Sequence, residues 1–143
     1  MSYENAVANM FALGHELSQT PSNKFDLAHM RVLLKAMNHP ERVFPSVLIA
    51  GTNGKGSTAA TLASILRASG LKTGLYTSPH LVRINERIRV NGKEIGDSHL
   101  ARLLGDVDRV SDHSVKRWLP EFDQILAALL SQAFRQTKPI KVA

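Results

Sequence analysis

Cysteine is absent from this sequence, and so are long hydrophobic runs. Without cysteine, disulfides and cysteine-based zinc sites are excluded, and a reducing compartment, the cytoplasm, is expected. The apolar segments fall far short of the ~20 residues that a membrane-spanning helix needs. The first residues, Met1 to Asn5, carry an acid and no basic segment, so neither a signal peptide nor a membrane partner is expected.

Aromatic residues are scarce, at 6% of the chain, whereas basic residues are in excess and give a formal net charge of +6. That excess favours anionic partners such as nucleotides, nucleic acids or acidic metabolites. It is also what a basic piece of a longer, more acidic protein would show. The densest basic group lies between Arg83 and Lys93 and lacks the interleaved aromatics of single-strand binders. Nucleic-acid binding is therefore an alternative that rests on charge alone, and no nucleic-acid partner is expected.

The order of the apolar patterns predicts an α/β fold, with a mostly parallel sheet and flanking helices in one domain over residues 1–143. A buried strand is expected at 46–50, then a glycine-rich turn, a helix near 56–69 and a second strand at 72–77. Elements in this order form a βαβ unit. Other elements are expected on both sides of it: helices at 4–18, 27–38, 98–110 and 122–133, a hairpin at 88–95 that turns at Asn91-Gly92, and a strand beginning at 140.

The strongest local signal is the segment Gly51-Thr52-Asn53-Gly54-Lys55-Gly56-Ser57, between the expected strand and helix. Glycines adopt backbone conformations closed to other residues and let phosphate oxygens approach the main chain. The N–H groups of such a turn, together with the start of the helix, form an anion site. Lys55 supplies a positive charge for the β- and γ-phosphates, and Ser57 places a hydroxyl where Mg²⁺ would sit. We therefore predict a phosphate-binding loop for ATP and Mg²⁺.

This loop departs from the common G-x-x-x-x-G-K-[ST] pattern, because Gly51 precedes Gly54 by three residues rather than five and Gly56 separates the lysine from the hydroxyl. A tight structural turn with an incidental lysine is the alternative interpretation. The G-x-G-x-x-G dinucleotide pattern is absent, which disfavours a nicotinamide enzyme. No two histidines are four residues apart, so a zinc hydrolase is not expected. His80 follows the expected strand at 72–77, where ligands gather in open α/β sheets, although a structural turn would also account for it.

Two stretches of the sequence together resemble the folylpolyglutamate synthase/dihydrofolate synthase family of the Mur ligase superfamily. The first is the loop with its neighbours, from Ala50 to Thr58, and the second runs from Gly74 to Gly92 through Thr77-Ser78-Pro79-His80. The second stretch distinguishes this family from the Mur ligases of cell-wall synthesis, which share the Gly-Thr-Asn-Gly-Lys loop. The resemblance extends from about residue 3 to about residue 135.

The resemblance implies an ATP-dependent ligase that joins glutamate to dihydropteroate or to a folate by an amide bond. In that family ATP phosphorylates the acceptor carboxylate, and the glutamate amine then displaces phosphate from the acyl phosphate. By position, the resemblance implies that the triphosphate binds to Gly51, Thr52, Asn53, Gly54, Lys55, Gly56, Ser57 and Thr58, with Lys55 as the catalytic cation. It likewise implies that magnesium binds to Ser57 and Ser78, and that the pteroate or folate binds to Asp26, His80, Phe122 and Asp123.

The sequence also departs from the family at the expected pteroate pocket and in its length. Asp123 stands where the family has glutamate, and Leu126 where it has threonine. Family members are about three times as long and have two domains. We therefore expect residues 1–143 to be a truncated N-terminal ATP-binding domain, without the C-terminal domain or the acidic magnesium ligand. The alternatives are a nucleotide-binding module without ligase activity and a fragment of a Mur-type peptide ligase.

Overall fold

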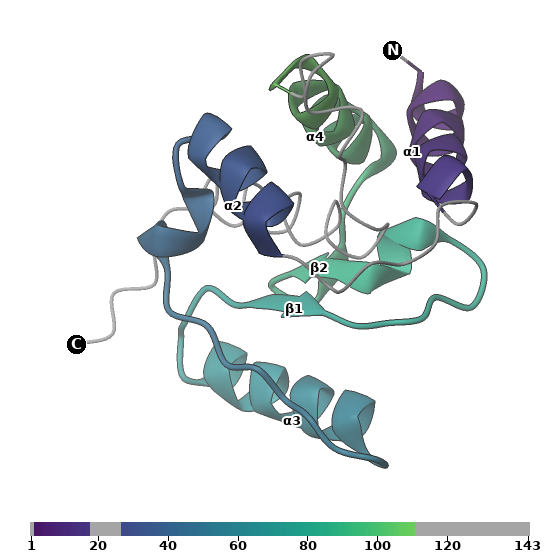
Figure 1. Ribbon diagram of the computed structural model, residues 1–143. Helices are drawn as coiled ribbons and strands as arrows, with labels where there is room; N and C mark the ends of the chain where they lie inside the picture. The colour runs from purple at the N-terminus through teal and green to yellow at the C-terminus, as the bar shows by residue number, and fades with distance from the viewer. Residues whose placement is uncertain (1, 18–26, 111–143) are drawn as a thin grey trace. The chain divides into compact units, whose positions relative to one another are not determined.

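The computed structural model describes residues 2–17 and 27–110. These residues form two compact units (Figure 1). Within the described part of the chain, the first unit contains residues 2–17, 27–41 and 97–110, and the second contains 42–96. The predicted helix at 122–133 and the strand beginning at 140 lie outside the described residues.

The first unit is helical and is built around α1 (Tyr3–Leu17), α2 (Leu27–Ala36) and α4 (Asp97–Val110). Helices α1 and α4 pack against each other. The spacing of the buried side chains explains the packing, because residues three and four apart share one face of a helix. On α4 these are Leu100, Ala101, Leu103, Leu104 and Val107, and on α1 they are Ala6 and Met10. All three helices were predicted from this periodicity, with bounds that differ by no more than two residues.

The second unit contains a three-stranded sheet in the order β1-β2-β3, made of β1 (Gly74–Tyr76), β2 (Ile88–Val90) and β3 (Lys93–Glu94). Leu75 pairs with Arg89, and Arg89 pairs with Glu94 on its other side. The predicted hairpin is confirmed, since Asn91 and Gly92 have φ values of 50° and 80°, as a two-residue type I′ turn requires. Helix α3 (Lys55–Ala68) contacts β1, and two short 3₁₀ turns, η1 (Pro40–Val43) and η2 (Ile84–Arg87), complete the described elements.

The predicted strand at 46–50 is wrong, because this segment has no strand conformation in the structure. Val47 and Leu48 are 72% and 93% exposed rather than buried. The predicted parallel pairing is likewise not found among the described residues, where both strand pairs are antiparallel. A parallel strand is stable when other elements cover both of its faces. Nothing in the described part of the chain hydrogen-bonds to 46–50 as a sheet neighbour, so its apolar sequence alone does not make it a strand.

Candidate functional site

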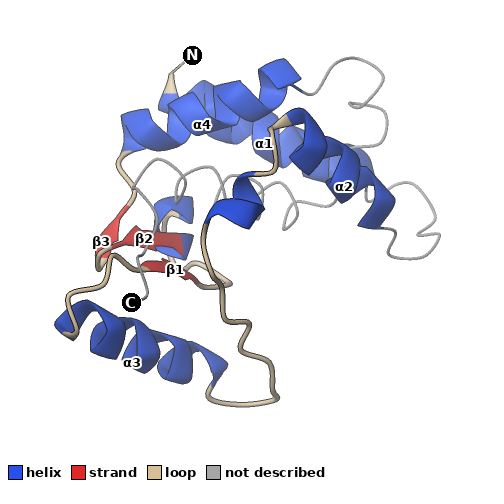
Figure 2. Ribbon diagram, turned by 90° about the vertical axis from the view of Figure 1, so that its left-hand side faces the viewer, coloured by secondary structure: helices blue, strands red, loops and turns tan. Residues whose placement is uncertain are grey.

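The glycine-rich loop leads directly into α3, as the tan chain before that helix in Figure 2 shows. Gly54 is the residue that caps the helix, and its φ of 72° lies in the left-handed region that favours glycine. No side chain caps this helix end, and its first turn carries no acidic residue. The first N–H groups of a helix have no partner within the helix. Here they lie in an exposed loop, so they can donate to an anion from solvent.

The side chain of Lys55 folds back over the loop that precedes it. Its Nζ donates to the carbonyl oxygen of Gly51 at 2.7 Å and to that of Thr52 at 3.2 Å. The N–H of Thr58 donates to the carbonyl oxygen of Gly54 at 2.9 Å and closes the first turn. The structure therefore brings an exposed cation and the uncapped end of α3 to the same short loop. That combination attracts anions by charge and by directed N–H donors.

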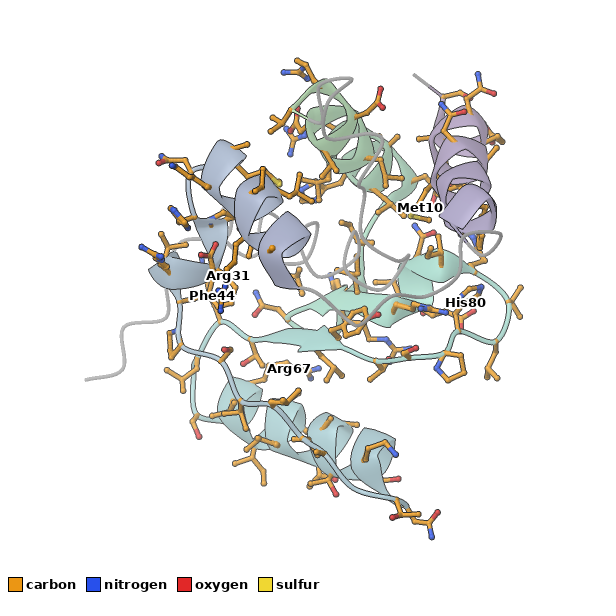
Figure 3. All side chains as sticks on the ribbon, viewed as in Figure 1. Met10, Arg31, Phe44, Arg67 and His80 are labelled. Atoms are coloured by element: carbon orange, nitrogen blue, oxygen red, sulfur yellow. The ribbon has the colours of Figure 1, made fainter. Side chains whose placement is uncertain are left out.

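A second loop, residues 77–83, carries two further predicted site residues, Ser78 and His80. Ser78 is exposed, and its peptide bond to Pro79 is cis. Arg87, which is 8% exposed, donates from Nε to Nδ1 of His80 at 2.9 Å, and Figure 3 labels His80 beside the sheet. An arginine always donates, so Nδ1 is the acceptor, and a neutral His80 carries its proton on Nε2. His80 can therefore offer an N–H donor to a ligand oxygen.

Glu86 closes the far end of this second loop with its carboxylate. It accepts the backbone N–H groups of Leu81 at 2.9 Å, Val82 at 2.9 Å and Arg83 at 2.7 Å. These bonds favour the charged form and lower the pKa of Glu86 from 4.5 to about 2. Sequence reasoning missed both Glu86 and Arg87. The Arg83-x-x-Glu86 spacing, which matches the glutamate position of a capping box, is the signal that could have found the first.

The remaining predicted site residues, Asp26, Phe122 and Asp123, lie outside the described residues. The two loops that carry the others belong to the same compact unit. No group of three or more histidine, aspartate or glutamate side chains that could hold a metal occurs among the described residues. No helix in the described ranges, 2–17 and 27–110, is long and apolar enough to cross a membrane.

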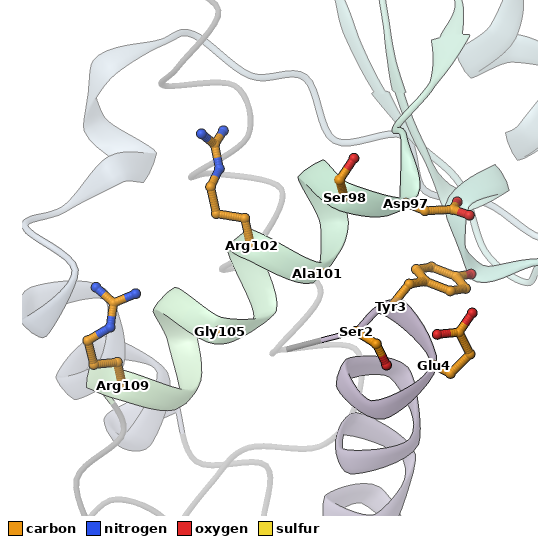
Figure 4. A pocket seen from close by; sticks show the side chains of 9 residues that line it. All are labelled: Ser2, Tyr3, Glu4, Asp97, Ser98, Ala101, Arg102, Gly105 and Arg109. Atoms are coloured by element: carbon orange, nitrogen blue, oxygen red, sulfur yellow. The ribbon is translucent and has the colours of Figure 1, made fainter.

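A separate hollow of about 790 Å³ lies within the first unit, between the start of α1 and one side of α4 (Figure 4). Its lining mixes acids and bases: Glu4 and Asp97 on one hand, Arg102 and Arg109 on the other. None of the residues predicted from the sequence contributes to it. Among these charges, Arg109 donates to Asp106 of the same helix at 2.8 Å.

Comparison with known proteins finds similar sequences and similar solved structures. The chain is 41% identical over 81 residues to the dihydrofolate synthase/folylpolyglutamate synthase of Bacillus subtilis, and 62% identical over 60 residues to that of Escherichia coli. A solved structure described as a complex of folylpolyglutamate synthase with AMPPCP and folate superposes on 96% of the chain with a TM-score of 0.80 and 31% identity. The chain resembles the folylpolyglutamate and dihydrofolate synthases. No protein-family model matches it.

The likeness to folylpolyglutamate synthase confirms the predicted α/β, Mur-ligase-like fold class. It covers only part of these proteins. The matches span 57% of this chain and 19% of the Bacillus subtilis protein, and 42% and 14% for the Escherichia coli protein. The chain covers 33% of the solved folylpolyglutamate synthase. The chain thus spans about a third or less of the relatives it matches.

Proposed function

We propose that this chain binds Mg-ATP at residues 51–58, as the nucleotide-binding part of a ligase that joins glutamate to dihydropteroate or to a folate. The observation that carries the proposal is the uncapped, acid-free start of α3 with the ammonium of Lys55 folded over the loop in front of it. Likeness to a folylpolyglutamate synthase in complex with AMPPCP and folate supports the same nucleotide and substrate class.

Each part of the loop has a chemical role in this proposal. The N–H groups of Gly51 to Ser57 would cradle the phosphates, and Lys55 would offset the negative charge that moves as the γ-phosphoryl group leaves ATP. Because Lys55 now contacts two carbonyl oxygens in an exposed loop, it can turn to a phosphate without leaving a buried group unpaired. The acceptor carboxylate becomes an acyl phosphate, and the glutamate amine then displaces phosphate.

The two residues assigned to magnesium, Ser57 and Ser78, carry the kind of ligand atom that this ion prefers. Mg²⁺ prefers oxygen ligands and keeps several waters, and the hydroxyls of Ser57 and Ser78 are exposed oxygen donors in the same unit. When bound, the ion would neutralise charge on the phosphates. We assign the pteroate or folate to Asp26, His80, Phe122 and Asp123, with the Nε2–H of His80 as a donor to an oxygen of that substrate.

The domain and compartment assignments complete the proposal. We propose that residues 1–143 correspond to the N-terminal ATP-binding domain of such a ligase, which agrees with coverage of 96% of this chain and 33% of the solved synthase. We also propose a cytoplasmic location, which the absence of cysteine favours.

Titration calorimetry with Mg-ATP tests the nucleotide site. Lys55→Ala should weaken binding by at least roughly tenfold, because it removes a charged donor to phosphate. Lys93→Ala, which removes another exposed lysine beside the hairpin turn, should leave the affinity unchanged. Absence of heat from the wild-type chain, while its circular dichroism shows it to be folded, would overturn the nucleotide assignment.

A coupled ADP-release assay, run on a protein that contains this chain together with the region matching the rest of the synthases, tests the reaction. Dihydropteroate or a folate together with glutamate should release ADP, and omission of either should abolish the release. Activity only with a UDP-linked peptide precursor would replace the proposal with a Mur-type ligase. Nucleotide binding without any ADP release would leave a nucleotide-binding module.

A further inference from the structure

We propose that Glu86 and Arg87 are positioning residues that hold the loop at 77–83 in place, so that Ser78 meets the metal of the bound nucleotide and His80 meets the pteroate or folate in a fixed arrangement. The part of this inference that concerns ligands, namely that Ser78 and His80 contact them, rests on the proposed function. The part that concerns how the loop is held rests only on hydrogen bonds within the chain. Two consecutive residues therefore secure a loop of seven.

The beginning of the loop is fastened by the backbone of Arg87. The N–H of Thr77 donates to the carbonyl oxygen of Arg87 at 3.0 Å, directly beyond the last pair of the β1–β2 ladder, Tyr76 with Ile88. The first loop residue is thus held as a continuation of the sheet. Ser78 is next in the chain, so the position of its backbone follows from this bond.

The middle of the loop is fastened by the side chain of Arg87. Its Nε donates to Nδ1 of His80 at 2.9 Å, and the arginine itself is 8% exposed. A buried guanidinium has few alternative positions, so it fixes the direction of the imidazole. With Nδ1 used as the acceptor, a neutral ring has its N–H donor on Nε2.

The end of the loop is fastened by Glu86, which accepts the three successive N–H groups of Leu81, Val82 and Arg83. With these N–H groups directed at Glu86, the side chains of Leu81 and Val82 stand in solvent, 92% and 82% exposed. Ser78 and Pro79 are exposed too. Hydrophobic burial therefore contributes little to holding this loop, and the polar bonds to Glu86 and Arg87 carry that role.

A loop that is held before ligand binding does not have to be ordered by the ligand, and this lowers the entropic cost of binding. Loss of the Glu86 bonds should therefore weaken those contacts that the loop makes. Ser78 is assigned to magnesium, whereas the cradle at 51–58 is a separate segment. The affinity for Mg-ATP should fall, and the affinity for metal-free ATP should not.

The first experiment measures the fastening without any ligand. Amide hydrogen exchange, followed by NMR, should speed up by roughly tenfold or more for Leu81, Val82 and Arg83 in Glu86→Gln, because those N–H groups lose a charged acceptor. Glu86→Asp, which keeps the charge on a shorter side chain, should give intermediate rates. Glu94→Gln is the matched control: its carboxylate is exposed and pairs with Arg89 at 3.4 Å, away from the loop, so exchange at 81–83 should be unchanged. Equal exchange in Glu86→Gln and wild type would overturn the fastening.

The second experiment measures ATP binding with Mg²⁺ and with EDTA for the same variants. Glu86→Gln should weaken Mg-ATP binding by about three- to tenfold and leave ATP binding in EDTA unchanged. Glu86→Asp, which keeps the charge, should lose less of the affinity for Mg-ATP than Glu86→Gln does. Faster exchange with an unchanged ratio of the two affinities would overturn the positioning role. An equal loss in both conditions would indicate general destabilisation and would also overturn it. If the wild-type chain binds no ATP at all, the proposed function and the positioning role fail, while the exchange data still decide whether Glu86 fastens the loop.

Discussion

Lys55 Nζ lies 2.7 Å from the carbonyl oxygen of Gly51, four residues earlier in the chain. This contact spans the turn that reverses at Gly54, where φ is 72°. The lysine, the turn and the uncapped end of α3 thus form one local arrangement that depends on sequence neighbours alone. An arrangement of this kind can be tested by separating its effect on stability from its effect on binding.

Gly56→Ala should raise stability and lower ATP affinity at the same time. Gly56 lies in the first turn of α3, and a Cβ added there would meet no heavy atom within 4 Å, so alanine should stabilise the helix by about 0.5–1 kcal/mol. In the proposed site, the same methyl group would stand where a phosphate oxygen approaches the main chain, so binding should weaken by roughly tenfold. Urea unfolding and calorimetry with Mg-ATP measure the two effects.

Gly105→Ala is the control for that substitution. Gly105 lies inside α4, and a Cβ there would also meet nothing within 4 Å, so a similar gain in stability is expected. Its distance in sequence from the loop predicts no change in ATP affinity. If Gly56→Ala and Gly105→Ala affected ATP binding alike, close approach of phosphate to Gly56 would be excluded.

The features that the sequence alone could predict are local ones. The period of the apolar residues indicated α1 and α4, and the Asn91-Gly92 pair indicated the hairpin. The glycine at 54 was expected to adopt a conformation closed to other residues, and its φ of 72° agrees. Each of these depends on a few neighbouring residues, so a window of the sequence contains the necessary information.

The features that the sequence could not predict depend on partners far away in the chain. Strand formation at 46–50 needs a neighbouring strand, and an apolar run does not supply one. Ile65 of α3 is 57% exposed although its side chain is apolar, because the face that a helix turns inward depends on what packs on it. Glu86 and Arg87 acquire their roles only once the loop at 77–83 closes on them. The roles of the predicted site residues stay predictions.

The stability contribution of Glu86 should disappear in acid. Its pKa is lowered from 4.5 to about 2 by the backbone N–H groups of Leu81, Arg83 and Val82. A group whose pKa is lower in the folded state stabilises the fold fully above its unfolded pKa, and this stabilisation is lost as the pH falls through the folded pKa. The difference in urea midpoint between wild type and Glu86→Gln should therefore be constant above about pH 5.5 and shrink between about pH 4.5 and pH 2. A difference that grows as the pH falls would contradict the assignment.

Ile88 and Leu48 should respond very differently to truncation, although both are large aliphatic residues of the same unit. Ile88 is 0% exposed in β2, so Ile88→Ala removes buried methyl groups and leaves a cavity, at a cost of about 2–5 kcal/mol. Leu48 is 93% exposed, so Leu48→Ala should change stability by less than about 0.5 kcal/mol. Urea unfolding monitored by circular dichroism measures both changes. A large loss in Leu48→Ala would mean that residues 46–50 are covered in solution.

Asn91 should be replaceable only by residues that keep both of its functions in the hairpin turn. Its φ of 50° lies in the left-handed region, and its Oδ1 accepts the N–H of Thr73 at 2.9 Å, while its own N–H donates to the carbonyl oxygen of Thr73 at 2.8 Å. Thr73 is 6% exposed, so a substitution that removes Oδ1 of Asn91 would leave the N–H of Thr73 buried and without this acceptor. Asn91→Gly keeps the conformation and loses the acceptor, and should cost about 1–2 kcal/mol. Asn91→Ala loses both and should cost about 1 kcal/mol more. Asn91→Asp keeps both and should be the least destabilised of the three by urea unfolding.

If Asn91→Gly were as stable as wild type, the hydrogen bond between Oδ1 of Asn91 and the N–H of Thr73 would contribute nothing to stability, and the turn conformation alone would account for asparagine at this position.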